Sequence, residues 1–163
     1  MEASAELFAL LKRVEGLRLR PYLDAAGYPT IGWGHRMLHP ESFPDGITED
    51  LAEHMLLCDV DDAESAVNLL VKVPLTQGQF DALCDFTFNL GEGSLAHSTL
   101  LRDLNAGQYN AAARQLLLWD HAGAQEVEGL RKRRLAEFEL WHEVPAGSIS
   151  PAIQDKEALH ESE

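Results

Sequence analysis

The stretch from Glu15 to His35, EGLRLRPYLDAAGYPTIGWGH, most constrains what this chain can fold into. Pro21 and Pro29 prevent a helix from continuing through it, because proline lacks the N–H that a helix interior needs. Aromatic and β-branched residues flank a turn near residues 25–27 that contains glycine, a pattern typical of short antiparallel strands. The stretch therefore predicts a small antiparallel sheet.

The remainder of the chain has the apolar spacing of helices. The expected helices cover residues 5–15, 48–73, 77–90, 98–105, 109–119 and 126–142. The segment 48–73 fits either one long helix or two abutting helices. Thr76 and Gln79 match a capping box at the start of the third segment, whose apolar residues on most sides predict a central helix. The predicted fold class is α+β, with a small β-lobe and a larger helical lobe.

Composition narrows the functional classes. A chain of 163 residues forms one domain, or one domain with two lobes. The net charge of −14 argues against a nucleic-acid partner. No apolar run is long enough to span a membrane, and the N-terminus does not resemble a signal peptide. We therefore expect a soluble protein that is made in the cytoplasm.

Cys58 and Cys84 stand singly in apolar patterns and are expected to be buried, reduced thiols.

Two carboxylates in contrasting surroundings suggest a catalytic site within residues 15–35. Glu15 ends a predicted helix, where the negative end of the helix dipole disfavours the charged carboxylate and favours a proton donor. Asp24 lies in a polar turn that should keep it ionised, and Thr30 offers a hydroxyl that could hold a water. Glycoside hydrolysis requires such a pair. A Glu and an Asp at this spacing are, however, more often two surface charges, so the residues alone indicate only a possible hydrolase.

The stretch resembles the catalytic signature of the phage-type lysozymes, the endolysins of T-even and lambdoid phages. The shared signature is Glu-Gly-Leu-Arg from Glu15, then Asp24, Gly27-Tyr28, Thr30-Ile-Gly and Gly34-His35. Further segments resemble the lambdoid branch: PLTQGQFDAL, FNLG, STLLR and GLRKRR. The resemblance covers roughly residues 5–142 in the family's order.

The resemblance implies a lysozyme-like catalytic domain over 1–144, with its β-lobe at about 17–47 and the active-site cleft between the lobes. Residues 145–163 would be a loosely ordered acidic tail. The implied reaction is hydrolysis, with inversion, of the bond between N-acetylmuramic acid and N-acetylglucosamine in peptidoglycan. Glu15 would be the acid, and Asp24 and Thr30 would position the water. The family needs no cofactor or metal.

Other residues carry over from the same resemblance. Gly34, Arg36, Phe88 and Asn89 match positions in or near the sugar cleft, although Phe88 could instead be core and Arg36 could face only solvent. His35 would form a structural ion pair with Asp59 that joins the lobes. Either Arg131 or Arg134 would pair with the catalytic Glu, while at least two of the four residues of that basic run would form a solvated helix face.

The implied endolysin would be a monomer that contacts peptidoglycan glycan strands, with no nucleic acid and no stable membrane partner. It would be made in the host cytoplasm and would act on the cell wall after release. Two other functions remain open. A lytic transglycosylase cleaves the same bond with one Glu, and the presence of both Asp24 and Thr30 argues against it. A non-catalytic wall-binding or particle module usually lacks a catalytic carboxylate, whereas Glu15, Asp24 and Thr30 are all present in this chain.

Overall fold

The computed structural model describes residues 1–122 and 125–143, so the tail predicted over 145–163 lies outside the described residues. Chain contacts divide the described residues into two compact units. We call Ala5–Asp62 the sheet unit, and Met1–Ser4 with the described residues from Ala63 onward the helical unit. The β-lobe expected at about 17–47 lies inside the sheet unit, which also contains the first helix.

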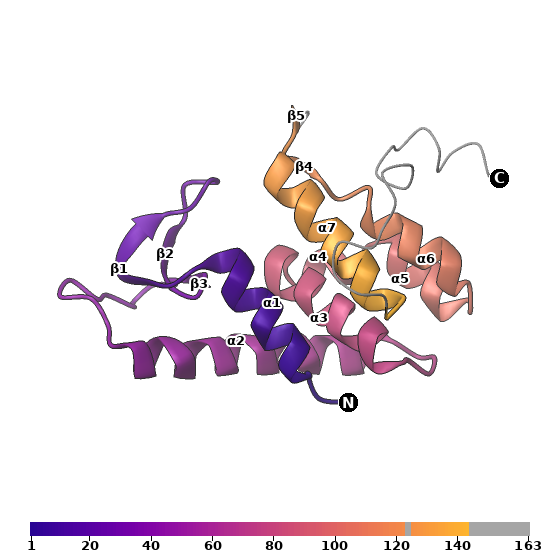
Figure 1. The fold of residues 1–163 in the computed structure, drawn as a ribbon, viewed down its shortest axis with the longest axis horizontal. Coiled ribbons are helices and arrows are strands. Elements are labelled where there is room, and N and C mark those ends of the chain that lie inside the picture. Colours follow the sequence, from indigo (N-terminus) through magenta and orange to yellow (C-terminus); the bar gives the residue numbers. More distant parts are fainter. Residues whose placement is uncertain (123–124, 144–163) are drawn as a thin grey trace. The chain divides into compact units, whose positions relative to one another are not determined.

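The sheet unit begins with α1 (Ala5–Glu15), as the sequence predicts. Gly16 follows with φ of +66°, the left-handed conformation that ends many helices and that glycine adopts without strain. Three antiparallel strands come next in the order β1-β2-β3 (Figure 1). They are β1 (Arg18–Leu23), β2 (Pro29–Gly32) and β3 (His35–Arg36).

The register of this sheet assigns its side chains to two faces. Thr30 lies opposite Tyr22 of β1 and opposite Arg36 of β3, so these three residues form one row across the strands. Ile31 lies opposite His35. Because neighbouring residues of a strand point to opposite faces, Ile31 and His35 occupy the face that does not carry Thr30. Ile31 is fully buried.

One continuous helix, α2 (Glu49–Leu70), follows the loop after β3, which decides between the one-helix and two-helix alternatives. It begins in the sheet unit and continues into the helical unit. Buried apolar residues recur along it at helical spacing: Ala52, Leu56, Val60, Ala63 and Val67. This regular stripe explains why the acidic residues Asp59, Asp61 and Asp62 do not interrupt the helix.

The central element of the helical unit is α3 (Gln77–Leu90). Its capping box is present as predicted, because Thr76 accepts from the backbone N–H of Gln79 and the Gln79 side chain accepts from the Thr76 N–H. Residues 80–87 are all buried. α3 packs beside α7 (Glu128–Trp141), and the two helices approach closely because Gly78 has no Cβ to meet the Leu140 carbonyl.

The remaining elements complete the helical unit. They are α4 (Glu92–Ala96), α5 (Thr99–Asn105), α6 (Tyr109–Leu116) and the hairpin of β4 (His121–Ala122) and β5 (Gln125–Glu126). The sequence did not predict α4 or this hairpin, because elements of five and two residues are too short to show a period. The described residues thus form a helical majority with a small antiparallel sheet, which confirms the α+β class.

Cys84 is buried and its burial raises the thiol pKa, but Cys58 is exposed, so the prediction of two buried thiols is wrong for Cys58. Cys58 lies on the solvent side of the amphipathic helix α2.

None of the helices in the described part of the chain has the length and apolar character that a membrane span requires.

Candidate active site

The carboxyl group of Glu15 is held against the backbone of Gly34. A Cβ atom built at Gly34 would lie 2.6 Å from Glu15 Oε2 and 2.7 Å from Cδ, closer than real Cβ atoms approach other atoms. Gly34 also has φ of +82°, which a residue with a side chain rarely adopts. Both facts require glycine here. The turn between β2 and β3 therefore fixes one side of the carboxyl group that ends α1.

Asp24 is positioned by the turn between β1 and β2. Its Oδ1 accepts hydrogen bonds from the N–H groups of Ala26 and Tyr28, at 2.9 and 2.8 Å. The Asp24 N–H and carbonyl bond to the Tyr28 carbonyl and the Gly27 N–H. Oδ1 is thus occupied by the turn, and the structure shows no hydrogen bond to Oδ2 from the described residues. One oxygen anchors the side chain, and the other can accept a proton from a bound molecule.

Thr30 lies in the middle strand and is only 3% exposed. Its hydroxyl donates to the Tyr28 carbonyl at 2.9 Å. Because the single hydroxyl proton is used in this bond, Thr30 meets any further partner as a hydrogen-bond acceptor.

Tyr22 links these residues. It lies opposite Thr30 in the sheet. Burial raises its pKa, and the nearby charges of Glu15 and Asp24 raise it further while Arg18 lowers it. Both carboxyl groups are therefore within electrostatic reach of one phenol. Glu15, Asp24 and Thr30 all lie in the sheet unit, and Tyr22 is the direct cross-strand partner of Thr30.

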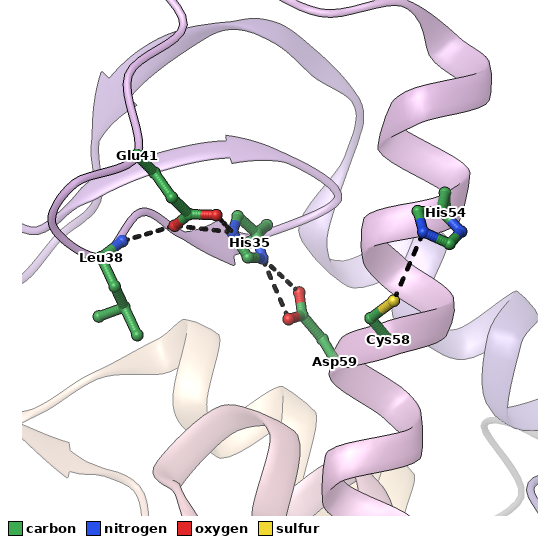
Figure 2. A network of polar contacts seen from close by, with 6 residues as sticks. All are labelled: His35, Leu38, Glu41, His54, Cys58 and Asp59. Carbon is green, nitrogen blue, oxygen red and sulfur yellow. Dashed lines mark hydrogen bonds and ion pairs between the residues drawn. The ribbon is translucent and has the colours of Figure 1, made fainter.

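His35 and Asp59 make the contact that the sequence predicts (Figure 2). His35 Nδ1 lies 2.9 and 3.0 Å from the Asp59 carboxylate oxygens, and this bond raises the His35 pKa more than partial burial lowers it. On the other ring nitrogen, Nε2 lies 3.3 Å from Glu41, which also accepts from the Leu38 N–H. The pair joins β3 to α2, and both residues belong to the sheet unit. The sequence did not predict Glu41 as a second partner.

Phe88 and Asn89 lie in the last turn of α3, in the helical unit. Phe88 is half-buried, and the Arg133 guanidinium lies 5.8 Å from its ring centroid. Asn89 Oδ1 accepts from Arg134 Nη2 at 2.9 Å. Because this bond fixes the carbonyl oxygen, the amide –NH₂ of Asn89 points the other way and can donate to another group.

The two arginines carried over by resemblance have different surroundings. Arg131 pairs with Glu128 at 3.0 Å and with Glu126 at 3.8 Å. Arg134 is completely buried, with its Nη2 2.6 Å from Glu137. The pairing of either arginine with Glu15 stays a prediction.

A buried ion pair that sequence reasoning missed holds α7 against α3. Arg133 Nε and Nη2 each donate to one carboxylate oxygen of Asp85 at 2.9 Å, and both side chains are buried. Burial alone would raise the Asp85 pKa, but the Arg133 guanidinium holds it below its ordinary value. Burial also raises the pKa of neighbouring Glu137 well above its usual range. The available signal was Asp85 itself, a charge within the apolar run of α3.

Across residues 1–122 and 125–143, no group of three or more His, Cys, Asp or Glu side chains could hold a metal ion. The exposed pair of His54 and Cys58 on α2, 3.8 Å apart, supplies only two potential ligands (Figure 2).

The chain is similar to known phage lysozymes over most of its length. Residues 12–137 match the family model described as phage lysozyme. An endolysin of Acyrthosiphon pisum secondary endosymbiont phage 1 is 40% identical over 86% of this chain and 98% of its own length. The endolysin of Salmonella phage P22 is 43% identical over 82% of this chain and 94% of its own length.

Solved structures have the same fold. A crystal structure of a P22 lysozyme mutant superposes with a TM-score of 0.74 at 41% identity, over 87% of this chain and 99% of that one. The muramidase domain of SpmX from Asticaccaulis excentricus gives a TM-score of 0.76 at 33% identity, covering 86% and 97%. With a family model that spans most of the sequence and relatives of 40% identity or more, the chain belongs to the phage lysozyme family and is a glycosidase of the muramidase type.

Proposed function

We propose that the protein is an endolysin that hydrolyses the β-1,4 bond between N-acetylmuramic acid and N-acetylglucosamine in bacterial peptidoglycan, with inversion at the anomeric carbon. Its relatives named endolysin, lysozyme and muramidase support the substrate. The observation that carries the mechanism is the Glu15 carboxyl held against Gly34 in the same unit as Asp24 and Thr30.

Glu15 is the general acid in this proposal. It transfers its proton to the glycosidic oxygen as the bond from that oxygen to the anomeric carbon breaks. A general acid must stay within hydrogen-bond reach of the leaving oxygen, so its carboxyl group has to be fixed in position. The contact of the Glu15 carboxyl with Gly34 supports this role, because the carboxyl cannot move toward the backbone at Gly34.

Asp24 and Thr30 hold the attacking water. The water donates one hydrogen to the Thr30 hydroxyl oxygen, whose own proton is committed to the Tyr28 carbonyl. It donates the other to Asp24 Oδ2, while Oδ1 stays bonded to the turn. The water oxygen then bonds to the anomeric carbon, and Asp24 takes the released proton. Inversion requires carboxyl groups about 6.5–9.5 Å apart, which leaves room for this water.

Four residues bind substrate in the proposal. Gly34 presents its backbone beside the Glu15 carboxyl, and Arg36 lies on β3 beside Thr30. In the helical unit, Phe88 supplies an aromatic surface and Asn89 an amide donor. His35 with Asp59, and Arg131 and Arg134, keep the supporting elements in place. The route needs no cofactor.

The protein would act as a monomer in host-cell lysis. We propose synthesis in the host cytoplasm and action on the cell wall after release, with no nucleic-acid partner and no stable membrane association.

Product analysis tests this proposal. Purified peptidoglycan is digested in H₂¹⁸O, and the new ends are examined by mass spectrometry and by NMR within the first minutes. Hydrolysis with inversion predicts one ¹⁸O per reducing end and the α-anomer as first product. Anhydro-ends without ¹⁸O would instead identify a lytic transglycosylase. A β-anomer would identify retention. Sedimentation with the wall but no cleavage would identify a wall-binding module. Each of these three results would overturn the proposal.

A further inference from the structure

The face of the sheet that carries Thr30 also carries two arginine–tyrosine stacks. Tyr22, Thr30 and Arg36 are direct cross-strand partners and share this face. Tyr28 directly precedes β2, and its ring stacks on Arg36, which belongs to this row. The Arg36 guanidinium lies 3.2 Å from the Tyr28 ring centroid, and that of Arg18 lies 4.7 Å from the Tyr22 ring. One stack thus lies on each side of Thr30.

The stack of Arg36 on Tyr28 is exposed, and the Tyr28 ring orients the Arg36 guanidinium. Arg36 is exposed, and Tyr28 keeps 44% of its surface accessible. The close centroid distance indicates that the guanidinium is held against the ring face. In this arrangement the ring occupies the face of the guanidinium, and the N–H groups along its edge stay able to donate in the plane. Such a fork matches the two oxygens of a carboxylate.

The charge of Arg36 has no carboxylate partner in the described part of the chain. The protein has 27 acidic and 13 basic residues, so carboxylates are plentiful along the chain. Arg131 and Arg133, for comparison, each pair with a carboxylate within 3.0 Å. The stack with Tyr28 therefore keeps a cation beside Thr30 without neutralising it.

We infer that Arg36 is a specificity-determining residue that binds a carboxylate on the peptide stem of the glycan strand, with Tyr28 as the residue that positions it. The inference rests on the proposed function and names the group that the site selects. A peptide stem is attached to the muramic acid next to the cleaved bond, so its carboxylates follow the sugar into the site. An acidic enzyme that attacks an anionic polymer gains from one local cation, because overall repulsion otherwise weakens binding.

The test compares two forms of one substrate, both free of wall phosphate polymers. One is purified peptidoglycan, and the other is the same material with its stem carboxylates converted to amides. For Arg36→Gln we expect kcat/KM on native peptidoglycan to fall about 10-fold, mostly through KM, as for a lost hydrogen bond to a charged group. On the amidated material the loss should be several times smaller. Arg36→Lys keeps the charge but loses the fork, and should lie between wild type and Arg36→Gln.

Two further variants serve as controls. Arg102→Gln makes the same charge change at a side chain that is 74% exposed in the helical unit, and should behave as wild type on both substrates. Tyr28→Phe keeps the ring and should retain the preference for native material, whereas Tyr28→Ala should lose it. Equal losses for Arg36→Gln on both substrates, or no loss on native peptidoglycan, would overturn the inference. If wild type cleaved neither substrate, the proposed function would fail instead.

Discussion

The Glu15 carboxyl and the Gly34 backbone are in contact so close that a Cβ atom at Gly34 would lie 2.6 Å from Oε2. The glycine-rich turn between β2 and β3 therefore has a specific task, to leave space for a carboxyl group at the end of α1. This relationship makes the site sensitive to a single methyl group.

Gly34→Ala should reduce activity by at least about 10-fold, because the added methyl must displace the Glu15 carboxyl, and small displacements of reacting groups are costly. Gly107→Ala is the matched control. Its φ of +78° is close to the +82° of Gly34, but a Cβ there meets nothing within 4 Å. Both variants should lose about 1 kcal/mol of stability through the left-handed backbone. If both retained full lytic activity, Gly34 would have no role in positioning Glu15.

Asp59→Asn should destabilise the protein more at pH 5.5 than at pH 9. The His35 pKa is raised in the folded state, chiefly by the bond to Asp59, so the pair's contribution is fully present below the ordinary histidine pKa of about 6.5. That contribution is lost as pH rises through the raised folded-state pKa. The expected cost at pH 5.5 is about 1.5–3 kcal/mol, the range for a hydrogen bond to a charged group. Thermal unfolding at both pH values measures it.

The exposed residue Asp61 supplies the control for this experiment. Asp61→Asn changes the net charge equally and should have the same small effect at both pH values. A cost of Asp59→Asn that did not change between pH 5.5 and pH 9 would contradict a charged His35 in the pair.

Arg133→Met should cost about 3–5 kcal/mol of unfolding free energy, because it leaves the Asp85 carboxylate buried without its two-pronged ion-pair partner. Replacing both partners, as in Arg133→Met with Asp85→Leu, should recover much of this loss, since the uncompensated charge is removed. Lys132→Met, at a side chain that is 72% exposed, should stay within about 0.5 kcal/mol of wild type. Urea unfolding measures all three. If Arg133→Met were as stable as wild type, the pair would not hold α7 against α3.

Lysis of intact cell walls should accelerate with moderate salt. The net charge of −14 gives the enzyme an unfavourable interaction with an anionic wall. Added salt screens this repulsion, because charges more than about 10 Å apart hardly interact at 0.1 M ionic strength. Initial rates measured from very low salt upward should therefore rise before they level. A steady fall over the same range would mean that local cations, not the net charge, dominate the encounter.

Much of this fold could be predicted from the sequence because its elements have local signals. The capping box at Thr76 and the regular apolar stripe of α2 predict helices without reference to the rest of the chain. Cys58 shows the limit of such reasoning, because an apolar-looking position can face solvent on an amphipathic helix. The hairpin of β4 and β5 has too few residues to carry a pattern.

The candidate site likewise contains residues that the sequence predicts and residues that it does not. A family signature in the sequence indicates Glu15, Asp24 and Thr30, and it predicts the contact of His35 with Asp59. The second carboxylate at His35, from Glu41, arises from the fold of a loop. The pair of Arg133 and Asp85 joins residues 48 positions apart, so no spacing rule could connect them.

The most direct test of the central claim is the clearing of a purified peptidoglycan suspension by wild type and by Glu15→Gln. Glu49→Gln, an exposed Glu at the start of α2, makes the same change away from the site. Equal melting temperatures would establish that all three proteins are folded. If Glu15 is the general acid, Glu15→Gln loses at least about 10²-fold in rate while Glu49→Gln clears as wild type does. Clearing by Glu15→Gln at the wild-type rate would contradict the assignment of Glu15 as the proton donor.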